Sequence, residues 1–174
     1  MDQDRIHVNG ESNGGLMTQR IAREATSLAA SVGVVNAAQP ANNDCGDPTG
    51  PIPIAFIVGT ADETMPWDGG NAGPGEMLSA EDTLAYWHTL DGCSGDGATE
   101  ALADLDQDDG STVELQTWSC TEADVVRYVA EGGGHVPPSI DQQTSDTWDA
   151  FAGEQNHDLE TAHALWAFFE AHPR

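Results

Sequence analysis

The chain has 174 residues, enough for one domain with a substantial core. Its 30 acidic residues oppose five arginines and no lysine, which gives a formal net charge of -25 and argues against nucleic acid or an anionic membrane as partner. The acids are interleaved with apolar residues rather than collected in a tail, so we expect a folded protein with an acidic surface. Such a surface is typical of adaptation to high salt, and we expect instability at low salt.

The first part of the chain predicts strands and a helix in alternation. Residues 5–8 (RIHV) form a short apolar strand, and residues 15–30 show helical spacing. The apolar face expected for that helix consists of Leu16, Met17, Ile21, Ala25 and Leu28. Residues 31–38 predict a second buried strand. Residues 52–61 (IPIAFIVGTA) form the clearest strand, apolar nearly throughout like a parallel strand covered on both faces.

The second part continues the pattern. Ser79 begins a predicted helix over residues 79–90, and residues 111–120 and 123–132 predict two strands joined by a tight turn. Residues 158–174 predict a closing amphipathic helix. Its expected apolar face contains Leu159, Ala162, Leu165, Trp166 and Phe169. Together these elements predict one α/β domain over residues 1–174, with a mostly parallel sheet flanked by helices.

A serine motif lies between the first predicted strand and helix. Gly10-Glu11-Ser12-Asn13-Gly14 satisfies G-x-S-x-G, the pattern of a nucleophile elbow. In such an elbow the glycines allow a sharp turn that holds the Ser12 side chain above the strand ends. The backbone N–H of Asn13 would donate to an oxyanion, helped by the helix dipole. The alternative is a glycine- and serine-rich cap before an ordinary helix.

An elbow of this kind requires an acid and then a histidine, each after a strand. Asp62 follows the clearest strand, and His135 follows the last strand after three consecutive glycines. His135 would act as base while Asp62 fixes its tautomer. Asp68 is an alternative acid in the same loop. The remaining histidines are expected to be structural or solvated: His7, His88, His157, His163 and His172.

No metal or other cofactor is expected. Asp104, Asp106 and Asp108 alternate like the first ligands of a calcium loop, but Asp109 and Leu115 stand where that loop needs glycine and glutamate. A solvated acidic loop is the better interpretation. The sequence also contains no run of about 20 apolar residues that could span a membrane.

The chain has three cysteines, Cys45, Cys93 and Cys120. Cys93 and Cys120 are the favoured pair because they flank an acidic, glycine-rich loop, and a disulfide there would indicate an oxidising compartment. The alternative is that all three are reduced.

Four segments resemble a known family: VNGESNGGLM, GTADETMPWDGG, LAYWHTLDGC and VVRYVAEGGGHVPP. They are similar to the extracellular esterases related to polyhydroxybutyrate depolymerases and feruloyl or acetylxylan esterases, carbohydrate esterase family 1. The resemblance implies an α/β-hydrolase fold with nucleophile Ser12, acid Asp62 and base His135. It also implies a disulfide between Cys93 and Cys120 and a secreted or extracytoplasmic protein, although the opening residues MDQDRIHV do not read as a signal peptide.

The sequence departs from this family in two places. Residues 136–139 read VPPS where many relatives carry TWPG, so an aromatic residue that could help to hold substrate is absent there. Among the tryptophans, Trp67 is the candidate for substrate binding because it lies in the same loop as Asp62. Relatives also have their first strands, and the loop that gives the second oxyanion donor, before the elbow. We therefore expect the C-terminal portion of a hydrolase domain, whose first strand is an exposed edge open to a completing chain or a homo-oligomer.

The leading functional hypothesis is a cofactor-free serine esterase that acts on polysaccharide-linked acyl groups, hydroxyalkanoate polymers or small acyl esters. One alternative is a peptidase like the prolyl oligopeptidases, which share the order of elbow, acid and histidine. The other is a non-catalytic binding module that retains the three residues.

Overall fold

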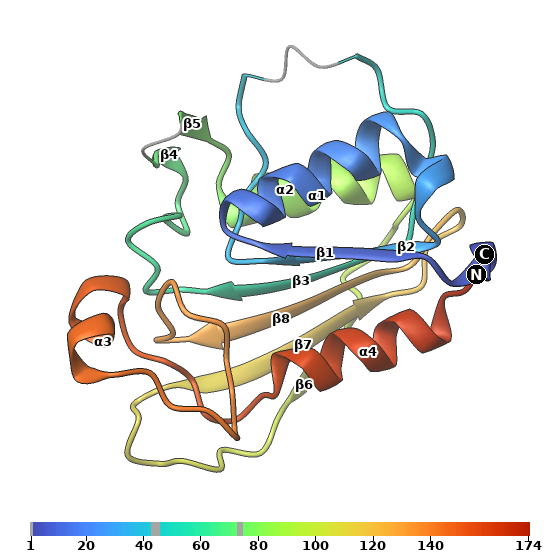
Figure 1. The fold of residues 1–174 in the computed structure, drawn as a ribbon. Coiled ribbons are helices and arrows are strands. Elements are labelled where there is room, and N and C mark those ends of the chain that lie inside the picture. Colours follow the sequence, from blue (N-terminus) through green and yellow to red (C-terminus); the bar gives the residue numbers. More distant parts are fainter. Residues whose placement is uncertain (1, 43–45, 73–74) are drawn as a thin grey trace.

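The computed structural model describes residues 2–42, 46–72 and 75–174, which fold as a sheet between helical layers (Figure 1). The helices are α1 (Asn13–Glu24), α2 (Ala80–Asp91), α3 (Asp146–Ala152) and α4 (Thr161–Ala171), with short 3-10 helices η1 (Gln3–Arg5) and η2 (Thr26–Leu28). The main sheet contains β1 (His7–Glu11), β2 (Ser31–Val35), β3 (Ile54–Gly59), β6 (Ala98–Ala101), β7 (Thr112–Trp118) and β8 (Val125–Glu131). A small separate sheet pairs β4 (Gly70–Asn71) with β5 (Glu76–Met77).

The main sheet has six strands in the order β1-β2-β3-β8-β7-β6. The first four run parallel, with Val34 opposite Phe56 and Ile57 opposite Tyr128. β7 is antiparallel to β8, and β6 is antiparallel to β7. The predicted α/β architecture is confirmed as a mixed, mostly parallel sheet with helices. Within the described residues β1 pairs with β2 alone, so it forms one edge of the sheet.

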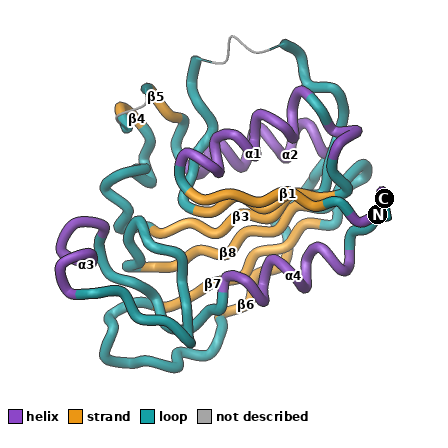
Figure 2. The backbone as a smooth tube through the Cα atoms, viewed as in Figure 1, coloured by secondary structure: helices purple, strands orange, loops and turns teal. Residues whose placement is uncertain are grey.

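Helices cover both faces of the sheet. α1 and α2 lie on one face and α4 lies on the other, while α3 lies near the carboxyl ends of the parallel strands (Figures 1 and 2). On the first face Ala22 of α1 and Trp87 of α2 share a core cluster with Val34 and Phe56. On the second face Leu165 and Phe168 of α4 pack with Ile57. Parallel strands covered on both faces explain the nearly continuous apolar runs of β2 and β3.

The apolar face predicted for α1 is right only in part, because Leu16 packs against the core but two other members of that face do not. Met17 and Leu28 are 54% and 59% exposed, and the buried residues of α1 are Gly15, Thr18, Gln19, Ala22 and Arg23. Small residues on α1 determine which face of the helix packs on the sheet, because a Cβ on Gly15 would meet the Cβ of Ala37 at 2.6 Å. Two of the buried polar side chains have partners on α2, because Trp87 donates to Gln19 and Arg23 donates to Tyr86. The Thr18 hydroxyl donates to the carbonyl of Gly14 within α1.

The start of the first strand and the buried face of the last helix also differ from the prediction. The first strand begins at His7 and not at Arg5, because Arg5 ends η1. On α4 the expected core residues Ala162 and Trp166 are exposed, the latter by 60%, and Phe168 is buried instead. The adjacent rings of Phe168 and Phe169 turn α4 toward the sheet, which leaves Trp166 outside.

A disulfide joins Cys93, just after α2, to Cys120, in the turn between β7 and β8. It closes a loop with a sequence separation of 27. Cys45 lies outside the described residues. Among the helices of the described chain, none is both long and apolar enough to cross a membrane.

Candidate active site

Ser12 occupies the sharp turn between β1 and α1. Its φ of 53° and ψ of -119° lie in a region that non-glycine residues avoid, and such strain is concentrated at functional sites. The Ser12 N–H donates to the carbonyl of Val35 on β2 at 2.9 Å, which fixes the turn against the sheet. A Cβ on Gly10 would meet the carbonyl oxygen of Gly14 at 2.3 Å, so the turn requires glycine at position 10. The Ser12 side chain is thereby held at the carboxyl end of β1.

His135 approaches Ser12 from the loop after β8. Its Nε2 lies 2.8 Å from the Ser12 Oγ, although the two residues are 123 positions apart in the sequence. The histidine loop is held by α3 and the segment after it: the N–H of Gly134 donates to the carbonyl of Glu154 at 2.8 Å. A Cβ on Gly134 would meet the carbonyl oxygen of Ala152 at 2.4 Å. Glycine at position 134 therefore allows the close approach that places the imidazole.

Asp62 follows β3 and contacts the other side of the same imidazole. Its Oδ2 lies 2.7 Å from the His135 Nδ1, and the Asp62 side chain is 2% exposed. The Asp62 Oδ1 accepts from the N–H groups of Thr64 and Met65 at 2.8 and 2.7 Å. Of the two candidate acids, the structure thus brings Asp62 to the histidine, whereas Asp68 is exposed and has no such contact with His135.

Two groups flank Ser12 on the elbow. Asn13 is the first residue of α1, so its backbone N–H belongs to the positive end of that helix. On the other side, burial raises the pKa of the Glu11 carboxyl, and the proximity of His135 opposes this shift. The arrangement can accommodate a serine that loses a proton to His135 and an oxyanion close to Asn13.

An open groove of about 590 Å³ adjoins the chain segments that carry Ser12 and His135. Gly10 and Glu11, just before Ser12, line one part of it, and Val136 and Pro137, just after His135, line another. Trp148 of α3 also lines the groove and is half exposed. The groove is therefore bordered by the residues next to Ser12 and His135 in the chain and by α3.

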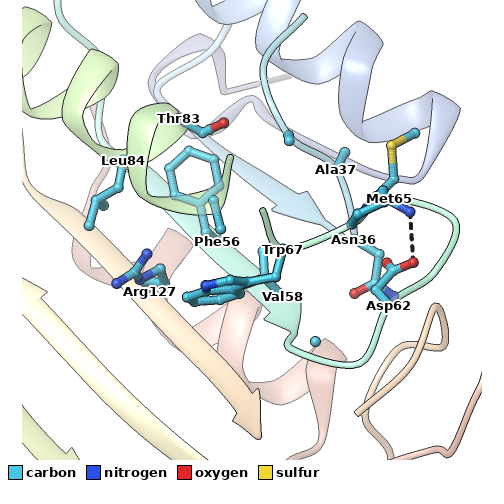
Figure 3. Close-up of a pocket in the computed structure, with 14 residues that line it drawn as sticks. Asn36, Ala37, Phe56, Val58, Asp62, Met65, Trp67, Thr83, Leu84 and Arg127 are labelled. Atoms are coloured by element: carbon cyan, nitrogen blue, oxygen red, sulfur yellow. Dashed lines mark hydrogen bonds between the residues drawn. The ribbon is translucent and has the colours of Figure 1, made fainter. Parts of the chain in front are cut away.

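A second, much smaller cavity of about 20 Å³ lies beneath the loop that carries Asp62 (Figure 3). It has room for about one water molecule. Trp67, the sequence candidate for substrate binding, lines this cavity, and its ring lies under the guanidinium of Arg127 on β8. The ring of Trp67 is thus part of the packing between β8 and the loop after β3 that carries Asp62, which we call the acid loop.

The acidic loop around Asp106 is organised by backbone contacts. The Asp158 Oδ1 accepts from the N–H groups of Leu105 and Asp106, and the Asp109 Oδ1 accepts from Ser111. Among the described residues, no group of three or more His, Cys, Asp or Glu is arranged to hold a metal ion.

The sequence interpretation missed two residues near the site. Asn36, directly after β2, is buried and has a φ of 47°. In the described chain, Asn36 and Ser12 are the non-glycine residues with a positive φ. Nothing in the residue type of Asn36 signals this conformation. Arg127 is buried in β8, and its signal was available: it is a charged residue inside the apolar run VVRYV.

No protein-family model matches the sequence. Over an alignment of 176 positions that covers 93% of the chain, the chain is 29% identical to "Putative esterase NocK" of Nocardia uniformis subsp. tsuyamanensis. The chain spans about half the length of this curated relative, since the match covers 50% of it. By sequence, the chain is therefore distantly similar to one part of a protein that is named a "Putative esterase".

Proposed function

We propose that this chain is the catalytic portion of a serine esterase with an α/β-hydrolase fold, as a single domain. Ser12 is the nucleophile, His135 the general base and Asp62 the acid that orients it. The observation that carries the proposal is the continuous hydrogen-bonded path from Ser12 Oγ through His135 to Asp62 Oδ2. Three segments separated widely in the sequence converge to make it, on a strained elbow that fits this role.

In the first half of the proposed reaction, His135 Nε2 takes the hydroxyl proton of Ser12 as Oγ attacks the ester carbonyl carbon. The carbonyl π electrons move to oxygen, and the resulting oxyanion accepts a hydrogen bond from the N–H of Asn13. Collapse of the tetrahedral intermediate breaks the bond to the alcohol oxygen, which leaves with the proton from His135. The acyl group remains on Ser12.

In the second half, His135 removes a proton from water, whose oxygen attacks the acyl carbon. Collapse breaks the bond to Ser12 Oγ, returns the proton to Ser12 and releases the carboxylic acid. Asp62 stays ionised throughout and holds the imidazole in the tautomer with Nδ1 protonated. Its two bonds from Thr64 and Met65 keep the carboxylate in place. These steps need no cofactor.

The proposed substrates are those of carbohydrate esterase family 1 relatives: acyl groups on polysaccharides, hydroxyalkanoate polymers or small acyl esters. The open groove beside Ser12 and His135 supports a large substrate, because it offers more room than a small acyl ester requires. We also propose a secreted or extracytoplasmic location in a high-salt environment. The disulfide between Cys93 and Cys120 supports an oxidising compartment.

The test is hydrolysis of p-nitrophenyl acetate in molar potassium chloride by the wild-type chain and by Ser12→Ala. Serine-dependent turnover, together with labelling of wild type but not Ser12→Ala by a fluorophosphonate, is the expected result. Equal hydrolysis rates for the two proteins would contradict the proposed nucleophile.

The alternatives give different outcomes in the same experiment. A peptidase of the prolyl-oligopeptidase type would also cleave a proline-containing anilide, and the similarity to an esterase favours the ester. A non-catalytic module would show neither labelling nor turnover, although Ser12, His135 and Asp62 are in contact.

A further inference from the structure

Arg127 is a buried cation at the centre of the sheet. It lies on β8 between Phe56 of β3 and Gln116 of β7 and is 5% exposed. Its Nε donates to the Gln116 side chain at 2.8 Å, and its Nη2 forms an ion pair with Glu81 of α2 at 2.9 Å. The guanidinium is therefore held in one orientation from two sides.

The fixed guanidinium lies over the ring of Trp67, with its Cζ 5.4 Å from the ring centroid. This distance is within the range of a cation–π contact. Trp67 is also tied by its backbone, because its carbonyl accepts from the N–H of Ala80 at the start of α2 at 2.8 Å. Figure 3 shows Arg127 beside Trp67, with Asp62 at the far side of the cavity.

Trp67 and Asp62 belong to one short loop. Asp62 begins it directly after β3, and its carboxylate closes a tight turn with the N–H groups of Thr64 and Met65. Met65 is buried and packs with Ala38. From Met65 two residues lead to the ring under Arg127. The path of the loop, and with it the direction of the Asp62 carboxylate, is thus defined at both ends.

Stability alone is a weak reason for this arrangement. The Arg127 Nη1 is buried and has no hydrogen-bond partner among the described residues. The side chain of its ion-pair partner Glu81 is 59% exposed, so the pair contributes little to stability, whereas burying the guanidinium itself is costly. Arg127 is also one of only five arginines in a strongly acidic chain.

We propose that Arg127 is a positioning residue: it clamps Trp67, so that the acid loop holds Asp62 against His135. This inference rests on the proposed function of these residues, since Arg127 acts on the reaction through the loop. Catalysis is sensitive to such placement because small displacements of an oriented group reduce the rate strongly. The clamp also gives Trp67 a role in geometry instead of substrate contact.

The experiment compares wild type with Arg127→Met and Arg127→Lys in the full chain. We expect Arg127→Met to lower kcat for p-nitrophenyl acetate on the order of tenfold, with KM unchanged within about twofold. Arg127→Lys keeps a cation near Trp67 and should recover part of the loss. A second readout is the low-field proton resonance of the His135 Nδ1–H, which should broaden or move upfield in Arg127→Met. It is measured without substrate.

Arg20→Met is the matched control, because it breaks an exposed ion pair with Glu24 on α1 and leaves the acid loop untouched. It should retain the wild-type kcat and proton signal. Trp67→Leu breaks the clamp from the loop side and should reproduce Arg127→Met, which decides the matter if Arg127→Met does not fold. An unchanged proton signal and kcat in folded clamp variants would overturn the proposal. The proton signal decides even if wild type shows no turnover.

Discussion

Asp62 and Asp68 show how one loop can contain two acids with different environments. Asp62 is almost fully buried and contacts His135, whereas Asp68 is exposed. Residue type and spacing allowed both, because both follow the same strand. The direction of the loop, which depends on contacts with α2 and β8, separates them.

The acid assignment predicts opposite results for two conservative substitutions. Asp62→Asn should lower kcat/KM on the order of a thousandfold or more, because the amide no longer stabilises the protonated imidazole or selects its tautomer. Asp68→Asn should leave kcat/KM within about twofold of wild type, as expected of an exposed residue without a contact to His135. Initial rates with p-nitrophenyl acetate measure both. A large loss in Asp68→Asn with normal Asp62→Asn would reverse the assignment.

At the scale of elements, the end of α2 contains an unusual carboxyl group. Asp91 is fully buried, and burial raises its pKa to about 7, against the effect of the bond its Oδ1 accepts from the N–H of Ile52. Its Oδ2 has no hydrogen-bond partner in the described structure. The folded state therefore prefers protonated Asp91, whereas the unfolded chain releases the proton near the ordinary aspartate pKa.

This difference predicts a pH dependence of stability. Because the folded pKa is raised, the contribution of Asp91 is fully present below the unfolded pKa near 3.8 and is lost as pH rises to about 7. The loss is roughly 4 kcal/mol in the free energy of unfolding. Asp91→Asn should remove this component, so its stability relative to wild type should rise from pH 4 to pH 7 and then level off.

Urea unfolding at several pH values and constant high salt measures the effect. Asp96→Asn is the control, because Asp96 is an exposed carboxylate in the loop after α2. A difference between Asp91→Asn and wild type that does not change with pH would contradict a raised pKa at Asp91.

Elements with strong apolar patterns could be predicted from the sequence. The apolar run of β3 and the capping Ser79 of α2 placed both elements within two residues of their observed bounds. β6 and α3 gave no such signal, because every residue of β6 is exposed and α3 is only one short helix of seven residues. The orientation of α1 also escaped prediction, since its buried face contains the polar residues Gln19 and Arg23, which have partners on α2.

The candidate site was more predictable than the packing around it. Ser12, Asp62 and His135 each follow a strand, and parallel strands bring their carboxyl ends to one edge of the sheet. Arg127 and Asn36 depend on contacts between distant segments. Their surroundings could not be inferred from the local sequence.

For the whole molecule, the net charge of -25 dominates the expected behaviour in solution. Self-repulsion among the acids opposes the compact state, and salt shortens its range to about 3 Å at 1 M. We expect the fold to be stable in molar potassium chloride and to unfold on dialysis to millimolar salt. Tryptophan fluorescence and circular dichroism measure the transition.

Acid offers an independent control for this salt dependence. Near the sequence pI of about 4.1 the net charge vanishes, so the fold should survive low salt at that pH. Identical spectra at millimolar and molar salt at neutral pH would show that self-repulsion does not limit stability.

Because β1 lies at an edge of the sheet, local unfolding can separate Ser12 from the rest of the candidate site. Among the described strands, β1 is bonded along one side alone, whereas β3 lies between β2 and β8. Local opening is easiest where a strand has the fewest bonds, so amide exchange with deuterium should be faster at His7–Glu11 than in the central strand β3. The serine should therefore detach while Asp62 and His135 are still joined. Such a molecule would keep most of its secondary structure and the contact between Asp62 and His135, yet would have already lost the proposed nucleophile.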